Sequence, residues 1–287
     1  MARVIRDIGE MQRLAESVRL SGKRIGVVPT MGSLHDGHLS LIRAARSQSD
    51  CVITTVFVNP SQFGPNEDFQ RYPRNLERDI DLTTGAGTDV VFAPDASMVY
   101  PEAFRTSIEV DKITTVLEGR FRPGHFRGVV TIVAKLFNMT KPHLAVFGQK
   151  DAQQVVVVRR MMRDLNFDIG LVLVPTVREQ DGLAMSSRNV YLTPEQRKEA
   201  PALYRALRHA EERVKGGEKD CAVLVAEMKQ ILSTNTSAVI DYVSIADGES
   251  LAELKTLERN PSALVSLAVR FGTTRLIDNI PLCGDPK

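Results

Sequence analysis

Residues 24–38 of this chain read RIGVVPTMGSLHDGH, and this stretch decides the fold. Its first part, residues 24–29, is a short apolar run ending in proline, which predicts a buried strand followed by a loop. Its second part, residues 29–38, holds two glycines and two histidines and precedes a stretch that predicts a helix over residues 39–48. A strand, a glycine-containing loop and a helix in this order are typical of the ligand-binding edge of an open α/β sheet.

Strands and helices alternate through the first two-thirds of the chain. Apolar residues recur at helical spacing between Val4 and Val18, which predicts an opening amphipathic helix. The pattern then predicts strands over residues 51–58, 89–93, 143–147 and 169–174 and helices over residues 75–82, 128–139 and 151–165. Alternation favours parallel pairing with right-handed crossovers. The expected fold class is therefore α/β, a Rossmann-like parallel sheet with helices on both faces.

The pattern changes after Pro175. A polar segment over residues 176–189 is followed by two helical stretches, and three apolar stretches then come at hairpin distance from one another. We expect the helices over residues 194–215 and 222–232 and the strands over residues 239–246, 263–271 and 275–280. This predicts two domains, a Rossmann-like domain over residues 1–176 and a smaller α+β C-terminal domain over residues 177–287.

Composition limits the classes of function. Of the 287 residues 43% are hydrophobic and 25% charged, as in ordinary globular proteins, and the net charge is only +2. A nucleic-acid binder would show a basic excess, so we expect no nucleic-acid partner. Apolar runs are too short for a membrane span, so we expect no membrane partner. The three cysteines, Cys51, Cys221 and Cys283, form no metal or redox motif, which favours reduced thiols in the cytoplasm.

The segment over residues 29–38 has the chemistry of a phosphate site. Gly32 and Gly37 let the backbone approach a ligand closely, and the N-terminus of the next helix favours an anion. Two imidazoles three positions apart, His35 and His38, can donate to one phosphate chain. Two other interpretations stay open. The histidines can be ordinary surface residues, or an HxxH metal pair, although nothing nearby supplies a third ligand.

Two further segments, each taken alone, are weaker evidence for a nucleotide site. In residues 147–151, FGQKD, Lys150 can reach a phosphate, and Asp151 can cap a helix or bind a ribose hydroxyl. Residues 185–189, MSSRN, supply two hydroxyls and a guanidinium, but alone they read as a solvated linker. Residues 35–38 read HDGH, an HxGH motif. Together with this motif, the two segments resemble the layout of class I aminoacyl-tRNA synthetases and their small nucleotidyltransferase relatives. In those families the first and last segments clamp the triphosphate of a nucleotide.

Several separate motifs narrow this resemblance. They are PTMGSLHDGH at 29–38, FVNPSQF at 57–63, YPR at 72–74, LEGR at 117–120, RPGHFRG at 122–128, FGQKDAQQ at 147–154 and DGLAMSSRN at 181–189. The likeness extends to RLIDN at residues 275–279. The chain thus closely resembles the pantothenate synthetase (pantoate–β-alanine ligase) family of the HxGH nucleotidyltransferase superfamily.

The resemblance implies an activity and a set of site residues. The implied reaction joins (R)-pantoate to β-alanine with ATP and Mg²⁺, releasing AMP and pyrophosphate through an enzyme-bound pantoyl adenylate. Catalytic roles fall on His35, His38, Lys150 and Arg188, with His38 as the proton donor, and Gln62 and Gln154 bind pantoate, Gln62 also lying near β-alanine. The residues implied around ATP are Pro29, Thr30, Met31, Gly32, Ser33, Leu34, His35, Asp36, Gly37, His38, Gly148, Gln149, Lys150, Asp151, Val177, Met185, Ser186, Ser187 and Arg188.

The resemblance also implies the roles of the domains and the assembly. Residues 1–176 would bind ATP and pantoate, residues 177–287 would form a lid, and the chain would form a homodimer. Gln149 stands where many family members have Glu, which changes the local charge balance. The metal ligands stay open, with Asp79 and Asp81 as candidates, and Phe63 can line the gem-dimethyl group of pantoate. Two alternatives also remain. One is a related nucleotidyltransferase that releases a dinucleotide-like product or uses another acid, and the other is a nucleotide sensor without activity.

Overall fold

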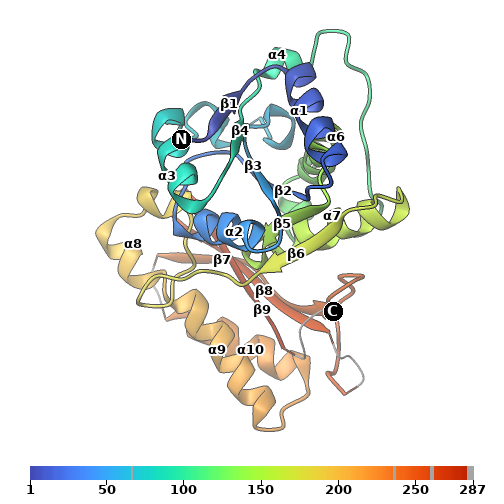
Figure 1. Ribbon diagram of the computed structural model, residues 1–287. Helices are drawn as coiled ribbons and strands as arrows, with labels where there is room; N and C mark the ends of the chain where they lie inside the picture. The colour runs from blue at the N-terminus through green and yellow to red at the C-terminus, as the bar shows by residue number, and fades with distance from the viewer. Residues whose placement is uncertain (66, 235–236, 259–261, 283–287) are drawn as a thin grey trace. The chain divides into compact units, whose positions relative to one another are not determined.

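The computed structural model describes residues 1–287 except 66, 235–236, 259–261 and 283–287, so Cys283 lies outside the described residues. The chain folds into two compact units (Figure 1). Unit 1 consists of Met1–Gln149 and Val157–Pro175, and unit 2 consists of Lys150–Val156 and Thr176–Lys287. The short Lys150–Val156 stretch therefore packs with the C-terminal part of the chain. The functional division into residues 1–176 and 177–287 stays a prediction.

Unit 1 is built on a six-stranded sheet in the order β1-β4-β3-β2-β5-β6, with every neighbouring pair parallel. The predicted parallel sheet is confirmed. Its strands are β1 (Arg3–Ile5), β2 (Ile25–Thr30), β3 (Cys51–Val56), β4 (Val90–Phe92), β5 (Leu144–Gly148) and β6 (Gly170–Val174). The strand order reverses at β2, which pairs directly with β5. The carboxyl ends of β2 and β5 are thus neighbours at a topological switch point, where open α/β sheets bind ligands.

Helices cover both faces of this sheet, α2 and α3 on one face and α1 and α6 on the other (Figure 1), as right-handed crossovers require. Side chains from α2, β2, β3 and β5 pack together in one buried cluster that includes Ile42, Val28 and Val146. The helical elements are α1 (Ile8–Leu20), α2 (Asp36–Arg46), η1 (Pro60–Gln62), η2 (Asp68–Gln70), α3 (Leu76–Ala86), α4 (Ala96–Val99), α5 (Glu118–Phe121), α6 (His125–Thr140), η3 (Gln149–Asp151) and α7 (Ala152–Asp164).

Two boundaries in unit 1 differ from the sequence prediction. The expected opening helix begins only at Ile8, where the side chain of Asp7 caps it, and residues 3–5 form β1 instead. The helix expected over residues 39–48 begins three residues earlier, at Asp36, because the side chain of His35 acts as its N-cap. The predicted loop residues Gly37 and His38 therefore lie in the first turn of α2.

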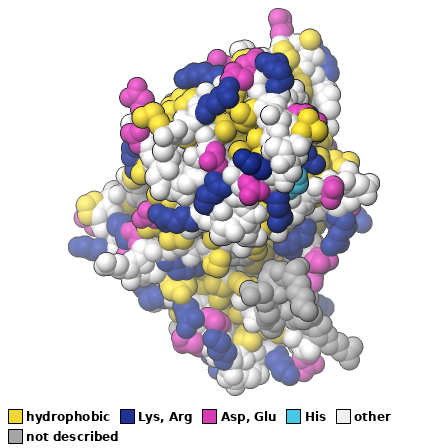
Figure 2. Space-filling view, in the orientation of Figure 1, with side chains coloured by type: hydrophobic (Ala, Val, Ile, Leu, Met, Phe, Trp, Pro, Cys, Tyr) yellow, Lys and Arg dark blue, Asp and Glu magenta, His cyan; other side chains and the backbone are white. Residues whose placement is uncertain are grey.

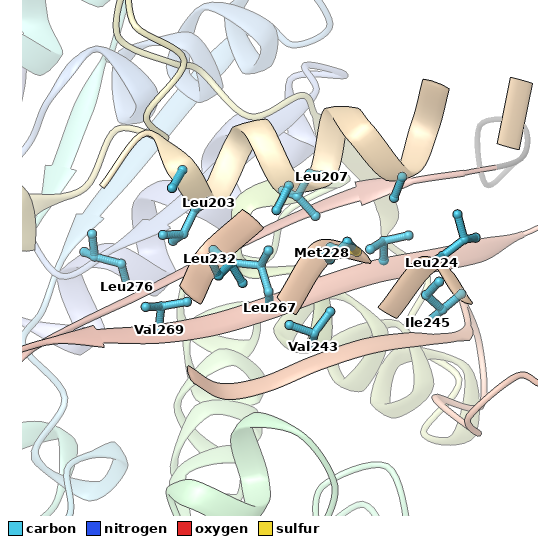
Figure 3. Close-up of a cluster of buried hydrophobic side chains, with 14 of the residues drawn as sticks. Leu203, Leu207, Leu224, Met228, Leu232, Val243, Ile245, Leu267, Val269 and Leu276 are labelled. Carbon is cyan, nitrogen blue, oxygen red and sulfur yellow. The ribbon is translucent and has the colours of Figure 1, made fainter. Parts of the chain in front are cut away.

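Unit 2 is α+β, as predicted. Its antiparallel strands β7 (Ala238–Asp247), β8 (Ala263–Phe271) and β9 (Thr274–Pro281) lie in the order β7-β8-β9. Its helical elements are η4 (Ser187–Tyr191), α8 (Pro194–Glu199), α9 (Ala202–Lys215) and α10 (Cys221–Ser233). Leucines of α9 and α10 pack against the sheet in one buried core (Figure 3). The single helix expected over residues 194–215 is interrupted at Pro201, which has no N–H to continue α8.

The surface agrees with the small net charge. On the face drawn in Figure 2, basic and acidic side chains are intermixed over both units rather than gathered into a field of one sign. Among the described residues, no helix combines the length and the apolar character that crossing a bilayer requires.

Candidate active site

The backbone after β2 makes a tight left-handed turn. Gly32 and Ser33 have positive φ angles of 78° and 53°. The hydroxyl of Thr30 accepts the Gly32 N–H at 3.2 Å and donates to the carbonyl of Thr55 at 2.6 Å. A Cβ at Gly32 would lie 2.8 Å from the Oδ2 atom of Asp79, so only glycine fits here. The turn is therefore constrained by the hydroxyl of Thr30 and by the close approach of Gly32 to Asp79.

The carboxylate of Asp79 in α3 anchors this turn. Asp79 is 1% exposed, and its two oxygens accept the N–H groups of Ser33 and Leu34, each at 2.9 Å. The neighbouring Arg78 donates to the Leu34 carbonyl at 3.3 Å. Leu34 itself is buried, and its N–H points at the protein's own carboxylate. Asp79 thus acts as a brace for the turn, whereas Asp81, the other candidate metal ligand, is exposed.

The two histidines lie at the N-terminus of α2 with their rings 4.2 Å apart. Nδ1 of His35 accepts the Gly37 N–H at 3.2 Å, and Nδ1 of His38 accepts the His35 N–H at 3.4 Å. Because a backbone amide can only donate, each neutral imidazole carries its hydrogen on Nε2. The helix N-terminus adds a partial positive charge. This arrangement suits an anionic ligand that accepts hydrogen bonds.

The segment after β3 meets the segment after β2. Gln62 ends η1 and is 8% exposed. Its Nε2 lies 3.0 Å from the sulfur of Met31, and its Oε1 accepts from Asn59 at 3.0 Å. The hydroxyl of Tyr100 donates to Asn59 Oδ1 at 2.9 Å. Gln62 and Met31, which the sequence predicts to bind pantoate and ATP respectively, are thus in contact.

Gly128 of the RPGHFRG motif allows α6 to lie directly against η1. A Cβ at Gly128 would lie 2.2 Å from the carbonyl oxygen of Ser61, closer than any side chain permits. The Gly128 carbonyl also accepts a hydrogen bond from Asn59 at 3.1 Å. The sequence identifies this glycine only through the family resemblance. The structure shows that it supports the turn ending in Gln62.

His125 of the same motif fixes the backbone of Gln62. Its Nδ1–H donates to the Gln62 carbonyl at 2.8 Å, and its Nε2 accepts from Arg122 at 3.1 Å. Arg122 in turn forms a bidentate ion pair with Glu67, with distances of 2.8 and 2.5 Å. Burial, with the nearby Arg122 charge, lowers the pKa of His125 to about 4. His125 is therefore neutral at physiological pH and holds the turn as a hydrogen-bond donor.

Phe63 belongs to an aromatic cluster beside η1. Its ring lies 5.3 Å from that of Phe69 and 5.9 Å from that of Tyr72, in tilted and edge-to-face arrangements. The guanidinium of Arg74 lies over the Phe69 ring at 5.2 Å. The YPR motif thus contributes to an apolar surface next to Gln62.

In unit 2 the predicted nucleotide-binding residues lie on two ordered segments. The Lys150 carbonyl accepts a hydrogen bond from the side chain of Asn279 at 2.8 Å. The Lys150 ammonium lies 4.0 Å from the carboxylate of Asp151, which is half-exposed. Gln154 follows in the first turns of α7 and is partly buried. The sequence predicts no role for Asn279, which contacts this segment, or for its neighbour Asp278.

Residues 177–185 form a small hairpin that leads into η4, rather than a solvated linker. The N–H of Met185 donates to the carbonyl of Val177 at 3.0 Å, so these two predicted ATP-binding residues are backbone partners. Ser186 caps η4 by accepting from the Arg188 N–H at 3.2 Å. Asn189 donates to the Ala184 carbonyl at 3.1 Å. The serines and Arg188 are thus presented from a structured turn.

The structure therefore gathers the predicted residues in two groups. Unit 1 contains the contacting pairs Met31–Gln62 and His35–His38. Gly148 ends the adjacent strand β5, and Gln149 follows it. In unit 2, β9 contacts both Lys150 and the hairpin over residues 177–185. Their contacts with substrates stay a prediction. Among the residues described, no group of three or more His, Cys, Asp or Glu side chains is arranged to hold a metal ion.

Comparison with known proteins gives consistent results. Residues 3–281 match the profile of the family described as Pantoate-beta-alanine ligase. The pantothenate synthetase of a Roseiflexus species is 55% identical over 280 residues, which cover 98% of this chain and 99% of that protein. The pantothenate synthetase of Acetivibrio thermocellus is 51% identical over 278 residues, covering 97% and 98%.

Solved structures agree with the sequence matches. Pantothenate synthetase from Thermus thermophilus superposes with a TM-score of 0.92 at 46% identity, covering 98% of this chain and 100% of that one. Pantoate-beta-alanine ligase from Francisella tularensis, in complex with beta-gamma ATP and beta-alanine, superposes with a TM-score of 0.79 at 33% identity and covers both chains completely (100%). The resemblance seen in the motifs is confirmed, and the chain belongs to the pantoate–β-alanine ligase family.

Proposed function

We propose that this chain joins (R)-pantoate to β-alanine at the expense of ATP, giving pantothenate, AMP and pyrophosphate. The observation that carries the proposal is the family match over residues 3–281, with the HxGH imidazole pair placed at a helix N-terminus directly after β2. The Francisella relative, solved with an ATP compound and β-alanine, supports these two ligands. All proposed substrates are small molecules.

The first step is the formation of pantoyl adenylate. Pantoate's carboxylate is ionised at neutral pH, so no general base is needed. A carboxylate oxygen attacks the α-phosphorus, the bond between the α-phosphorus and the bridging oxygen breaks, and pyrophosphate leaves. The requirements are alignment and neutralisation of charge on the phosphate oxygens. The Nε2–H groups of His35 and His38 would donate to these oxygens, with His38 as the proton donor, and Lys150 and Arg188 would supply positive charge.

ATP binding is assigned to the segments named by the family resemblance. These are residues 29–38, 148–151 and 185–188, together with Val177. Two contacts refine this assignment for the first segment. The N–H groups of Ser33 and Leu34 donate to Asp79, so their contribution is to shape the turn rather than to donate to phosphate. Met31 and the imidazoles of His35 and His38 remain among its proposed contacts.

Pantoate binding is assigned to Gln62 and Gln154. An uncharged amide both donates and accepts, which suits a hydroxy acid with two hydroxyls and a carboxylate. Gln62 is held by Asn59 through its side chain and by His125 through its backbone, so its amide is preorganised. The aromatic cluster around Phe63 would contact the gem-dimethyl group.

The second step forms the amide bond. The amine of β-alanine attacks the acyl carbon, the bond from that carbon to the adenylate oxygen breaks, and AMP leaves. The amine must first lose a proton, because an aliphatic ammonium has a pKa near ~10. This first proton passes to solvent. The nitrogen loses a second proton after it has attacked the acyl carbon, and the departing phosphate is the acceptor that we propose for it. Closure by residues 177–287 as a lid, which would protect the mixed anhydride from water, remains a prediction.

Mg²⁺ is proposed to enter as the MgATP complex. The carboxylate of Asp79 already accepts two backbone N–H groups, and Asp81 is exposed, so these two candidate ligands do not form a cage for this ion. Magnesium commonly keeps several waters and binds substrate phosphates in such enzymes. Its role would be to neutralise charge on the triphosphate.

Assembly and location are proposed from the resemblance alone. A homodimer would have about twice the chain mass of 31.8 kDa, which light scattering after size-exclusion chromatography would measure. Cytoplasmic action is consistent with the free, buried thiols of Cys51 and Cys221.

The activity is tested by incubating the purified chain with ATP, pantoate and β-alanine, singly and together. We expect AMP and pantothenate in equal amounts only when all three are present. Turnover with another acid but not with pantoate would instead identify a related nucleotidyltransferase. ATP binding without AMP formation under any combination would identify a nucleotide sensor.

A further inference from the structure

Two adjacent residues of β9 contact both nucleotide segments of unit 2. Asn279 is 4% exposed, and its side-chain amide donates to the Lys150 carbonyl at 2.8 Å. Asp278 is 2% exposed, and its carboxylate binds the guanidinium of Arg178, which follows Val177 in the hairpin. Segments far apart in the sequence are therefore attached to neighbouring positions of one strand.

The attachment of the hairpin is extensive. The two Arg178–Asp278 hydrogen bonds measure 2.6 and 3.0 Å, a bidentate geometry. Arg178 also donates to the Gly182 carbonyl at 3.1 Å, and its guanidinium stacks 3.9 Å above the ring of Tyr204. A Cβ at Gly182 would lie 2.4 Å from that ring, so the hairpin tip packs closely on Tyr204. The hairpin thus has little freedom relative to β9.

Asp278 and Asn279 are also coupled to each other. The N–H of Asn279 donates to the Asp278 carboxylate at 2.8 Å, which fixes the carboxylate that holds Arg178. Burial raises the pKa of Asp278, while Arg178, this N–H and the charge of Lys150 oppose that shift. Lys150 is therefore linked to the pair both by its backbone and by electrostatics.

We propose that Asp278 and Asn279 are positioning residues for the nucleotide site: Asn279 sets the place of Lys150, and Asp278 sets the hairpin that carries Val177 and Met185. This rests on the function proposed above. Neither residue is required to touch ATP. Their effect is to keep the Lys150 ammonium at a fixed distance from the hairpin, and a displacement of ~1 Å can lower a rate about 100-fold.

A double-mutant cycle separates this role from a purely structural one. The variants are Asn279→Ala, Lys150→Ala and the double variant, and the readout is kcat/KM for ATP in pantoate-dependent ATP–pyrophosphate exchange. We expect Asn279→Ala to lower it about 10- to 100-fold in the wild-type background and to cause little further loss in the Lys150→Ala background. A residue that acts through Lys150 has nothing left to position once that side chain is removed.

The chain offers a matched control. Ser266 of β8 lies directly opposite Asn279 in the strand register and is also buried, at 7% exposure. Ser266→Ala perturbs the same strand pair without changing a contact to Lys150, and we expect kcat/KM within about 2-fold of wild type. Asn279→Asp, which replaces the donor by an acceptor facing the Lys150 carbonyl, should be at least as impaired as Asn279→Ala.

If Asn279→Ala does not fold, Arg178→Lys serves instead. It keeps the charge but loses the bidentate contact, and a raised KM for ATP is expected. An additive cycle, an unchanged kcat/KM in folded Asn279→Ala, or an unchanged KM in Arg178→Lys would overturn the proposal. If the wild-type chain shows no pantoate-dependent exchange, it is the proposed function that fails.

Discussion

The carboxylate of Asp79 accepts the backbone N–H of Leu34 at 2.9 Å, and this buried contact fixes the residue immediately before His35. Its second oxygen holds the N–H of Ser33 in the same way. A side chain of α3 thereby sets the start of α2, and with it the place of both imidazoles. The geometry proposed for phosphate binding therefore depends on a residue that is not part of the HxGH motif.

Replacing Asp79 by Ala should leave two buried N–H groups without their acceptor. We expect a loss of roughly 2–3 kcal/mol in the free energy of unfolding, together with weaker ATP-dependent activity. Urea denaturation followed by circular dichroism measures the first effect. Asp81→Ala, on the exposed side of the same helix, is the control and should stay within about 0.5 kcal/mol of wild type. Equal losses in the two variants would contradict the role given to Asp79.

His125 should make stability depend on pH on the acid side. Its pKa is about 4 in the folded chain against an ordinary value of 6.5, so between these values the unfolded chain binds more protons. Stability should therefore fall as the pH drops from about 6.5 to about 4, by up to about 3 kcal/mol from this group. Denaturation at several pH values tests this expectation.

The variant His125→Asn removes this titration while keeping an N–H that can donate to Gln62. Its stability should vary less between pH 6.5 and 4 than that of wild type. An identical pH profile for wild type and His125→Asn would show that His125 is not the group responsible.

A methyl group at position 128 should disturb pantoate binding. In Gly128→Ala the new Cβ would meet the Ser61 carbonyl, so α6 or η1 must move, at a cost of about 1–3 kcal/mol. Since η1 ends in Gln62, the KM for pantoate should rise. Gly85→Ala in α3 is the matched control, because no atom lies within 4 Å of its Cβ, and it should be neutral or stabilising. A normal pantoate KM in folded Gly128→Ala would argue against this coupling.

His38→Ala should lower the rate of adenylate formation by about two orders of magnitude, as the removal of a preorganised donor typically does. Pantoate-dependent ATP–pyrophosphate exchange measures this step without β-alanine. The control is His209→Ala, which changes a histidine of α9 that is distant in sequence from residues 29–38 and has no proposed role. It should keep the wild-type rate. Normal exchange by the His38 variant would remove it from the catalytic role.

Gln62→Ala should act mainly on pantoate. Loss of an amide that donates to and accepts from the substrate should raise the KM for pantoate about 10-fold or more, because each lost hydrogen bond is worth about 0.5–1.5 kcal/mol. Gln48→Ala, at an exposed position after α2, is the control. If pantoate dependence is the same in both variants, Gln62 does not belong to the binding site.

Local pattern is sufficient to predict the parallel sheet, whereas the segments of the candidate site come from the family resemblance and stay a prediction. The strand over residues 24–29 and the hydrophobic positions of α2 are visible in adjacent residues, and the parallel order follows from alternation. The sequence pattern does not predict the three-residue strand β1, because it is too short to show a period. The start of α2 was misplaced because His35 is an uncommon N-cap.

The supporting contacts of the site could not be predicted in the same way. Asp79 with Leu34, His125 with Gln62 and Asn279 with Lys150 each join residues distant in sequence. The sequence around Asp79 does not show whether its carboxylate braces a loop, binds a metal or faces solvent. Only the fold shows which backbone groups its oxygens meet.

The central chemical claim is that a pantoate carboxylate oxygen attacks the α-phosphorus of ATP. It is tested by supplying pantoate labelled with ¹⁸O in both carboxylate oxygens and analysing the products by mass spectrometry. We predict one ¹⁸O atom in AMP, one in the amide carbonyl of pantothenate and none in pyrophosphate. Unlabelled AMP in a reaction that forms pantothenate, or label in the released pyrophosphate, would contradict the account.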